Sequence, residues 1–218
     1  MGLVIFDCDG VLVDSEGISA RVGAEVLTDL GWPVTADEVI RRFAGCTDEY
    51  WRASVEGELG RPLEDGWDAA YSSWYDDAFD AELEAVPGVA SAIAAIDVPF
   101  CVASNGSHDK IRASLTRVGL AETFEGRIFS AQDVPNGKPA PDLFLYAAQA
   151  MGVAPQEAVV VEDTPTGLAA ARAAGMRCLA YASGLIPEDR LAETQASVFF
   201  DMRQLPALVA GLSRRPVS

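Results

Sequence analysis

The sequence is short of histidine, of basic residues and of long apolar runs, and each shortage disfavours a class of protein. Its 218 residues include one histidine and four scattered cysteines without a C-x-x-C pair, so we expect neither a zinc site nor a redox motif. Sixteen Lys and Arg face 33 Asp and Glu, and a net charge of −17 repels nucleic-acid phosphates and anionic lipid. No apolar run approaches the length of a membrane span, and the N-terminus lacks a basic leader. We therefore expect a cytoplasmic protein with no nucleic-acid or membrane partner.

Six short apolar runs predict strands at residues 3–6, 100–104, 127–131, 158–163, 177–182 and 198–200. Their continuous apolar character is typical of strands that are buried on both faces of a parallel sheet. Helical patterns fill intervals between them, at about 108–118, 142–151 and 166–174, and each ends at a glycine that suits a left-handed helix end. This alternation predicts an α/β fold with a Rossmann-like, doubly wound parallel sheet.

Residues 16–83 break the alternation, because they contain helical patterns and no convincing strand. Thr35-Ala36-Asp37-Glu38 is a capping-box pattern, and Thr47 is a candidate cap for the next helix. Four aromatics follow helical spacing, and we favour the core of a small bundle over a binding surface for them: Trp67, Tyr71, Trp74 and Tyr75. We therefore predict an α/β core domain at 1–15 and 84–218, with an all-helical cap domain inserted at 16–83.

Two acidic pairs lie at the ends of predicted strands. Asp7 and Asp9 follow the first strand, and Glu162 and Asp163 end the strand at 158–163. Open α/β sheets bind ligands at such strand ends, although the Asp-x-Asp-Gly segment taken alone also fits an ordinary polar turn. Two carboxylates about 5 Å apart repel by roughly 3 kcal/mol at an effective dielectric constant of 20, so a converged cluster would need a counter-cation. Clustered oxygen ligands suit Mg²⁺.

Two segments between these pairs carry groups that suit an anion. Ser104 and Asn105 begin a Ser-Asn-Gly turn, whose hydroxyl, amide and backbone N–H groups could bind a phosphate. Lys138 lies in Gly-Lys-Pro-Ala-Pro-Asp, where two prolines restrict the backbone around one of few cations. Taken alone, the first is a common turn and the second is equally compatible with a surface lysine.

Together and in this order, the four segments resemble the motifs of the haloacid dehalogenase superfamily of phosphohydrolases, over the whole chain. Asp7-Cys8-Asp9-Gly10-Val11 resembles the first motif, and Ser104, Lys138 and Glu162-Asp163 resemble the second, third and fourth. The helical segment 16–83 follows the first motif, and in this it resembles the subgroup whose small helical cap is inserted at that point. That subgroup includes sugar-phosphate phosphatases, phosphoglycolate phosphatases and β-phosphoglucomutase. The resemblance implies a Mg²⁺-dependent phosphatase for a small phosphorylated metabolite, a sugar phosphate or phosphosugar acid, and we expect a monomer or small homo-oligomer.

The resemblance also implies roles for the acidic residues. Asp7 would attack phosphorus to form an aspartyl-phosphate, and Asp9 would serve as general acid and then as general base. The Asp7 carboxylate, the Asp9 backbone carbonyl and Asp163 would hold Mg²⁺, with Glu162 as a direct or water-mediated ligand.

The resemblance implies that the remaining motif residues bind the substrate. Lys138 would neutralise charge, Ser104 would hydrogen-bond the phosphoryl oxygens, and Asn105 would contact the phosphoryl group or the substrate. Two alternatives stay open, a phosphoglycolate phosphatase and a β-phosphoglucomutase-like mutase. Related mutases carry an arginine just beyond the specificity loop, at Gly45-Cys46-Thr47 here, and a histidine soon after the first motif. This chain has Asp48 and Ser19 instead, which favours hydrolysis.

Overall fold

The computed structural model describes residues 1–44, 46, 48–192, 194 and 196–213. It divides the chain into two compact units: an α/β unit of Met1–Asp14 and Glu84–Ser218, and a helical unit of Ser15–Leu83. Gly45 and Thr47, to which we assigned a specificity loop and a helix cap, lie outside the described residues.

Six parallel strands form the sheet of the α/β unit, in the order β3-β2-β1-β4-β5-β6. The strands are β1 Leu3–Phe6, β2 Phe100–Ser104, β3 Ile128–Ser130, β4 Ala158–Glu162, β5 Arg177–Tyr181 and β6 Ser197–Phe199. All six predicted strands are present, each within one residue of its predicted ends. The chain runs from β1 outwards to β3, then returns to β4 and runs outwards to β6, so the order reverses between β1 and β4. The predicted doubly wound parallel sheet is confirmed.

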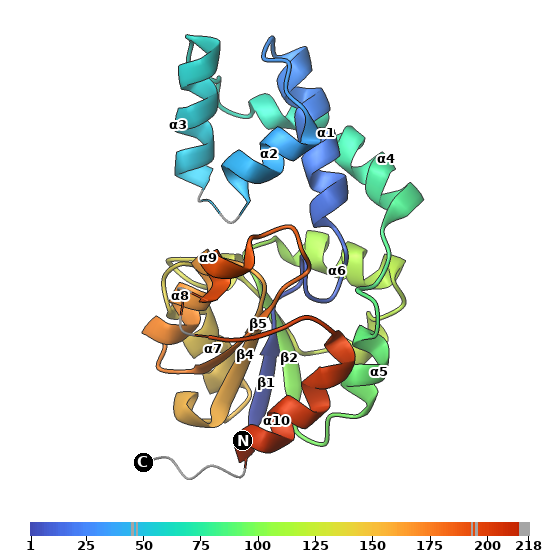
Figure 1. Cartoon of the computed structure of the whole chain (residues 1–218), viewed down its shortest axis with the longest axis vertical. Coiled ribbons are helices and arrows are strands. Elements are labelled where there is room, and N and C mark those ends of the chain that lie inside the picture. Colours follow the sequence, from blue (N-terminus) through green and yellow to red (C-terminus); the bar gives the residue numbers. More distant parts are fainter. Residues whose placement is uncertain (45, 47, 193, 195, 214–218) are drawn as a thin grey trace. The chain divides into compact units, whose positions relative to one another are not determined.

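Helices cover both faces of this sheet: α5 Val89–Ala94, α6 His108–Arg117, α7 Asp142–Ala150, α8 Pro165–Ala173, α9 Glu188–Ala192 and α10 Leu205–Ser213. Figure 1 shows α7 and α8 on one side, and α5 and α10 on the other. Leu3 and Ile5 of β1 are fully buried in the core that packs against α7 and α8. Phe6 points to the opposite face, where its ring packs edge-on against Phe124. Because both faces of β1 are buried, its apolar run has no alternation.

Three of the four cysteines lie in apolar runs of the α/β unit, Cys8, Cys101 and Cys178. Cys8 and Cys101 are buried, whereas Cys178 in β5 is only half-buried. Cys178 lies in the second strand from one edge of the sheet and packs against the core cluster that contains Leu3 and Ile5.

The helical unit contains four α-helices among its described residues, α1 Glu16–Asp29, α2 Ala36–Phe43, α3 Asp48–Leu59 and α4 Ser72–Glu82, with a 3₁₀ helix at Trp67–Tyr71. The predicted capping box opens α2: Thr35 Oγ1 accepts from the Glu38 backbone N–H, and Glu38 Oε2 accepts from the Thr35 backbone N–H. The prediction of a core role is confirmed for Trp67, which packs on a buried cluster, but not for Trp74, which is 38% exposed. The 3₁₀ helix interrupts the expected α-helical face, because it turns every three residues rather than every 3.6.

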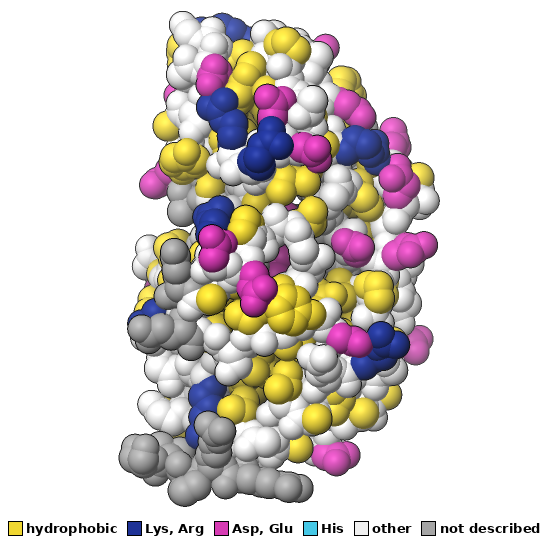
Figure 2. Space-filling model, in the orientation of Figure 1, with side chains coloured by type: hydrophobic (Ala, Val, Ile, Leu, Met, Phe, Trp, Pro, Cys, Tyr) yellow, Lys and Arg dark blue, Asp and Glu magenta, His cyan; other side chains and the backbone are white. Residues whose placement is uncertain are grey.

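Acidic side chains are spread over the face of the molecule drawn in Figure 2, and the coloured residues on that face show no broad basic patch. None of the helices among the described residues is both long and apolar enough to cross a bilayer.

Candidate active site

Two acidic segments meet where β1 and β4 lie side by side. Phe6 pairs with Val161, and the backbone N–H of Asp7 donates to the Val161 carbonyl at 2.9 Å. Asp7 therefore emerges next to Glu162, at the point where the strand order reverses, and open α/β sheets bind ligands there. One carboxylate oxygen from each of Asp7, Glu162 and Asp163 lies within 4.8 Å of the others, and all three residues are buried.

Gly10 allows Asp163 to join this group. It adopts a left-handed φ of 73° in the tight turn after β1, where its N–H donates to the Val13 carbonyl at 2.8 Å. A Cβ at this position would lie only 2.0 Å from Asp163 Oδ2. The glycine of the Asp-x-Asp-Gly motif thus serves both a backbone conformation and a close approach of the carboxylate.

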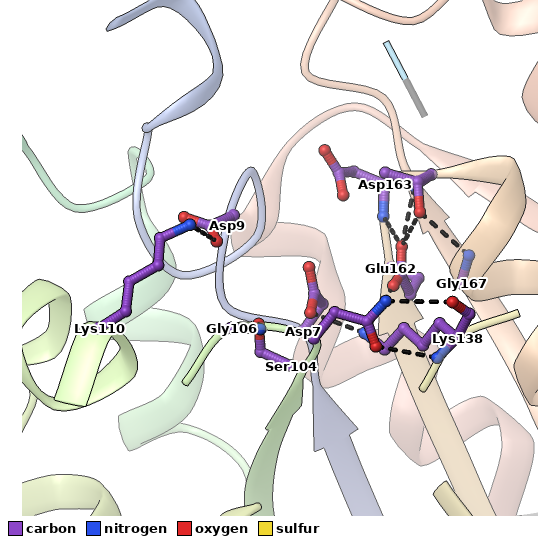
Figure 3. Close-up of polar contacts among 11 residues, drawn as sticks. Asp7, Asp9, Ser104, Gly106, Lys110, Lys138, Glu162, Asp163 and Gly167 are labelled. Carbon is purple, nitrogen blue, oxygen red and sulfur yellow. Dashed lines mark hydrogen bonds and ion pairs between the residues drawn. The ribbon is translucent and has the colours of Figure 1, made fainter. Parts of the chain in front are cut away.

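Lys138 supplies a buried positive charge between two of the carboxylates (Figure 3). Its Nζ lies 2.7 Å from Asp7 Oδ1 and 2.8 Å from Glu162 Oε1, and its side chain is 4% exposed. The ammonium also lies 4.7 Å from the centre of the Phe144 ring. Burial lowers the pKa of Lys138, but attraction to Asp7 and Glu162 outweighs burial and holds that pKa above its ordinary value.

Burial has the opposite consequence for Asp7. Loss of water raises the pKa of Asp7 to about 7; Lys138 opposes this rise and the neighbouring Glu162 carboxylate adds to it. The group of carboxylates therefore holds more negative charge than one lysine compensates, and it favours an additional cation or a proton.

Both oxygens of Glu162 are already engaged. Oε1 binds Lys138, and Oε2 accepts hydrogen bonds from the backbone N–H groups of Asp163 and Thr164 and from the Thr164 hydroxyl, at 2.8–3.0 Å. Gly167 leaves the space for this carboxylate, since a Cβ there would lie 1.7 Å from Oε1. Glu162 thus fixes Lys138 in place. Sequence reasoning missed Thr164, although a threonine before a proline is a typical start of a helix, here α8.

Asn105 holds the backbone of Lys138 from the other side. Its Oδ1 accepts from the Lys138 N–H at 2.8 Å, and its Nδ2 donates to the Lys138 carbonyl at 3.1 Å. A Cβ on Gly137 would lie 2.8 Å from Asn105 Oδ1, so this close contact also depends on a glycine. Ser104, at the end of β2, is buried and accepts from the Gly106 N–H at 3.2 Å. The contacts predicted between these two residues and the substrate stay predictions.

Asp9 is not a member of the three-carboxylate group found among the described residues. Its Oδ2 lies 2.9 Å from Nζ of Lys110, which extends from α6 (Figure 3). The charge of Asp9 raises the pKa of Lys110. Sequence reasoning missed Lys110, although one signal was available: the chain contains only two lysines, Lys110 and Lys138.

Known proteins resemble this chain along most of its length. Residues 1–175 match the family model of haloacid dehalogenase-like hydrolases. The 6-phosphogluconate phosphatase of Escherichia coli (strain K12) is 32% identical over 207 residues, which cover 94% of this chain and 93% of that protein.

Two solved structures share the fold. A haloacid dehalogenase-like protein of unknown function from Agrobacterium tumefaciens str. C58 is 38% identical, with a TM-score of 0.87 over 98% of this chain and 100% of that one. A HAD family hydrolase from Deinococcus radiodurans R1, crystallised with bound phosphate and sodium, is 29% identical, with a TM-score of 0.81 over 100% and 99%.

The chain belongs to the haloacid dehalogenase-like hydrolases. The predicted class of enzyme, a hydrolase of phosphoric monoesters, is confirmed, as are the predicted family and fold.

Proposed function

We propose that this protein is a Mg²⁺-dependent phosphatase that hydrolyses a small phosphorylated sugar or sugar acid through an aspartyl-phosphate. One observation carries the proposal: the buried Asp7 carboxylate contacts the Lys138 ammonium at 2.7 Å and shares a 4.8 Å group with Glu162 and Asp163. A carboxylate that attacks a phosphate dianion must have the charge of both partners reduced. A fixed lysine and an acidic group able to hold a divalent cation, side by side, meet that requirement.

The chemistry would proceed in two displacements. A carboxylate oxygen of Asp7 forms a bond to phosphorus while the bond to the leaving oxygen breaks, and Asp9 donates a proton to that oxygen. Water then attacks the phosphorus of the aspartyl-phosphate, Asp9 accepts its proton, and the bond between phosphorus and Asp7 breaks. Inorganic phosphate leaves, and both side chains return to their starting state. Ser104 would hydrogen-bond the phosphoryl oxygens during both steps.

The donor set fits a hard divalent cation, because it consists of buried carboxylate oxygens. We propose that Asp7, Asp163 and the Asp9 backbone carbonyl hold Mg²⁺. The ion would supply further neutralisation of the phosphoryl charge. Because Glu162 already binds Lys138 and three donors, we propose that it acts on the ion through an intervening water at most.

The proposed substrate class rests on relatives. The Escherichia coli relative is named a 6-phosphogluconate phosphatase, and a relative from Thermotoga maritima, 29% identical over 81% of this chain, is named a phosphorylated carbohydrates phosphatase. We propose that residues 16–83 form a cap domain that selects the substrate and excludes water, and that residues 1–15 and 84–218 form the catalytic core. Cytoplasmic location and a monomeric or small oligomeric state stay predictions.

Phosphate release from a panel of sugar phosphates, phosphosugar acids and phosphoglycolate tests the proposal, with Mg²⁺ and with EDTA. Asp7→Asn should abolish release, whereas Asp14→Asn, an exposed aspartate seven residues along, should retain it. Acid quenching of the native enzyme during turnover should leave a phosphoryl group on the peptide that contains Asp7. Undiminished release in EDTA or by Asp7→Asn would refute the mechanism. A mutase would instead interconvert two sugar phosphates and release little phosphate.

A further inference from the structure

Each of the two lysines of the chain forms an ion pair with an aspartate of the first motif. Lys138 binds Asp7, and Lys110 binds Asp9, while every other cationic side chain apart from the single histidine is an arginine. Lysine is a compact point charge on a flexible stem, so it can reach one carboxylate oxygen without the planar, two-pronged contact of arginine. A lysine, rather than an arginine, therefore suits the contact seen at each aspartate, in which one carboxylate oxygen meets the cation.

Helix stability does not explain Lys110. It is the third residue of α6, and a cation in the first turn of a helix is disfavoured by the positive end of the helix dipole. Its ion pair with Asp9 contributes little to stability either, because the two side chains are 46% and 23% exposed.

The start of α6 is nevertheless built to aim Lys110 at the site. Ser107 caps the helix and accepts a hydrogen bond from the Lys110 backbone N–H at 3.2 Å. Side chains on a helix lean towards its N-terminus, and α6 begins just after β2 ends at Ser104, so the lysine stem points to the strand ends. The stem runs past the turn that joins β2 to α6, since a Cβ on Gly106 would be in van der Waals contact with Cδ of Lys110 at 3.4 Å and with Oγ of Ser104 at 3.6 Å.

We propose that Lys110 is a positioning residue that orients the Asp9 carboxyl group for proton transfer. Its ammonium donates to Oδ2 of Asp9, and we assign the transferred proton to Oδ1. The neutral acid can keep this arrangement, because Oδ2 then accepts from Lys110 as a carbonyl oxygen while the Oδ1 hydroxyl donates to the leaving oxygen. The inference rests on the proposed function, in which Asp9 is the acid and base.

The dependence of activity on the leaving group tests this role. An alkyl phosphate needs a proton on its departing alkoxide, whereas p-nitrophenyl phosphate releases a stable phenolate and needs little help. The measured quantity is the ratio of kcat/KM for the best alkyl phosphate to kcat/KM for p-nitrophenyl phosphate. Since kcat/KM includes steps only up to release of the alcohol or phenol, hydrolysis of the phosphoenzyme does not enter the ratio. Turnover of p-nitrophenyl phosphate also reports that each variant is folded.

Lys110→Met should lower this ratio by about tenfold or more, a part of the roughly 10²–10⁴ that general acid catalysis contributes. Lys110→Arg should restore part of the loss. Arg112→Met removes a cation from an exposed position two residues along the same helix, and it should leave the ratio unchanged.

Asp9→Asn separates failure of this inference from failure of the proposed function. A low ratio in both Asp9→Asn and Lys110→Met supports the inference. A low ratio in Asp9→Asn with a native ratio in Lys110→Met overturns the inference alone. A native ratio in Asp9→Asn overturns both. If the ratio of Lys110→Met falls only for alkyl phosphates that carry a carboxylate, and stays native for neutral sugar phosphates, Lys110 binds the substrate instead and the positioning role is overturned.

Discussion

Replacing Lys138 by methionine should destabilise the α/β unit strongly, and more at high pH than at low pH. The substitution keeps most of the side-chain volume but removes the ammonium that contacts Asp7 Oδ1 at 2.7 Å and Glu162 Oε1 at 2.8 Å. Because all three side chains are buried, the two carboxylates would be left without their cation in a poorly solvated site. Removing one partner of a buried ion pair lowers the free energy of unfolding by about 3–5 kcal/mol.

The pH dependence follows from the sign of the Asp7 shift. Burial already raises the pKa of Asp7 to about 7, and Lys138 is the group that opposes that rise. Without Lys138, the folded protein binds the Asp7 proton still more tightly than the unfolded chain does. Binding of this proton therefore stabilises the folded state at low pH. The stabilisation is lost as the pH rises through the elevated pKa of Asp7 in the folded state. The destabilisation should therefore be larger at pH 8 than at pH 5.

Thermal unfolding in EDTA, followed by calorimetry at both pH values, measures the effect. At about 2–4 °C per kcal/mol for a protein of this size, the Tm of Lys138→Met should fall by roughly 6–20 °C at pH 8. Lys110→Met is the matched control, since its ion pair with Asp9 is more exposed and an exposed pair contributes about 0.2–1 kcal/mol. Equal losses for the two variants, or a larger loss for Lys138→Met at pH 5, would refute the reasoning.

Three further predictions concern the site. Gly10→Ala should weaken Mg²⁺ binding about tenfold or more in calorimetric titration, because a Cβ would lie 2.0 Å from Asp163 Oδ2 at a backbone φ of 73°; native affinity would contradict the close packing. Asn105→Ala should lower the Tm by the equivalent of about 1–3 kcal/mol and reduce kcat, since it removes both hydrogen bonds to the Lys138 backbone; a change in KM alone would indicate the predicted substrate contact instead. Mg²⁺ should raise the Tm more at pH 8 than at pH 5.5, because protons compete for Asp7, whose pKa is about 7; a pH-independent shift would argue against Asp7 as a ligand.

Local patterns in the sequence were sufficient to predict the sheet and the family, and to name residues that the structure brings together at the strand ends. The strands of the α/β unit are short apolar runs that end in turn or acidic residues, and this signal does not depend on distant contacts. Asp7, Lys138 and Asp163 could be named because each directly follows a strand or precedes a helix within a recognisable motif. The capping box at Thr35 was equally visible, since its partners lie three residues apart.

Tertiary structure alone decided how the side chains of the site are paired. The contacts of Lys110 with Asp9 and of Lys138 with Asp7 join residues 101 and 131 positions apart, and no local pattern specifies such partners. No local pattern specifies the two hydrogen bonds between Asn105 and the Lys138 backbone either, or the exposure of Trp74. Strand and helix signals are set by neighbours along the chain, whereas side-chain partners are set by which distant segments pack together and by the small residues that let them approach.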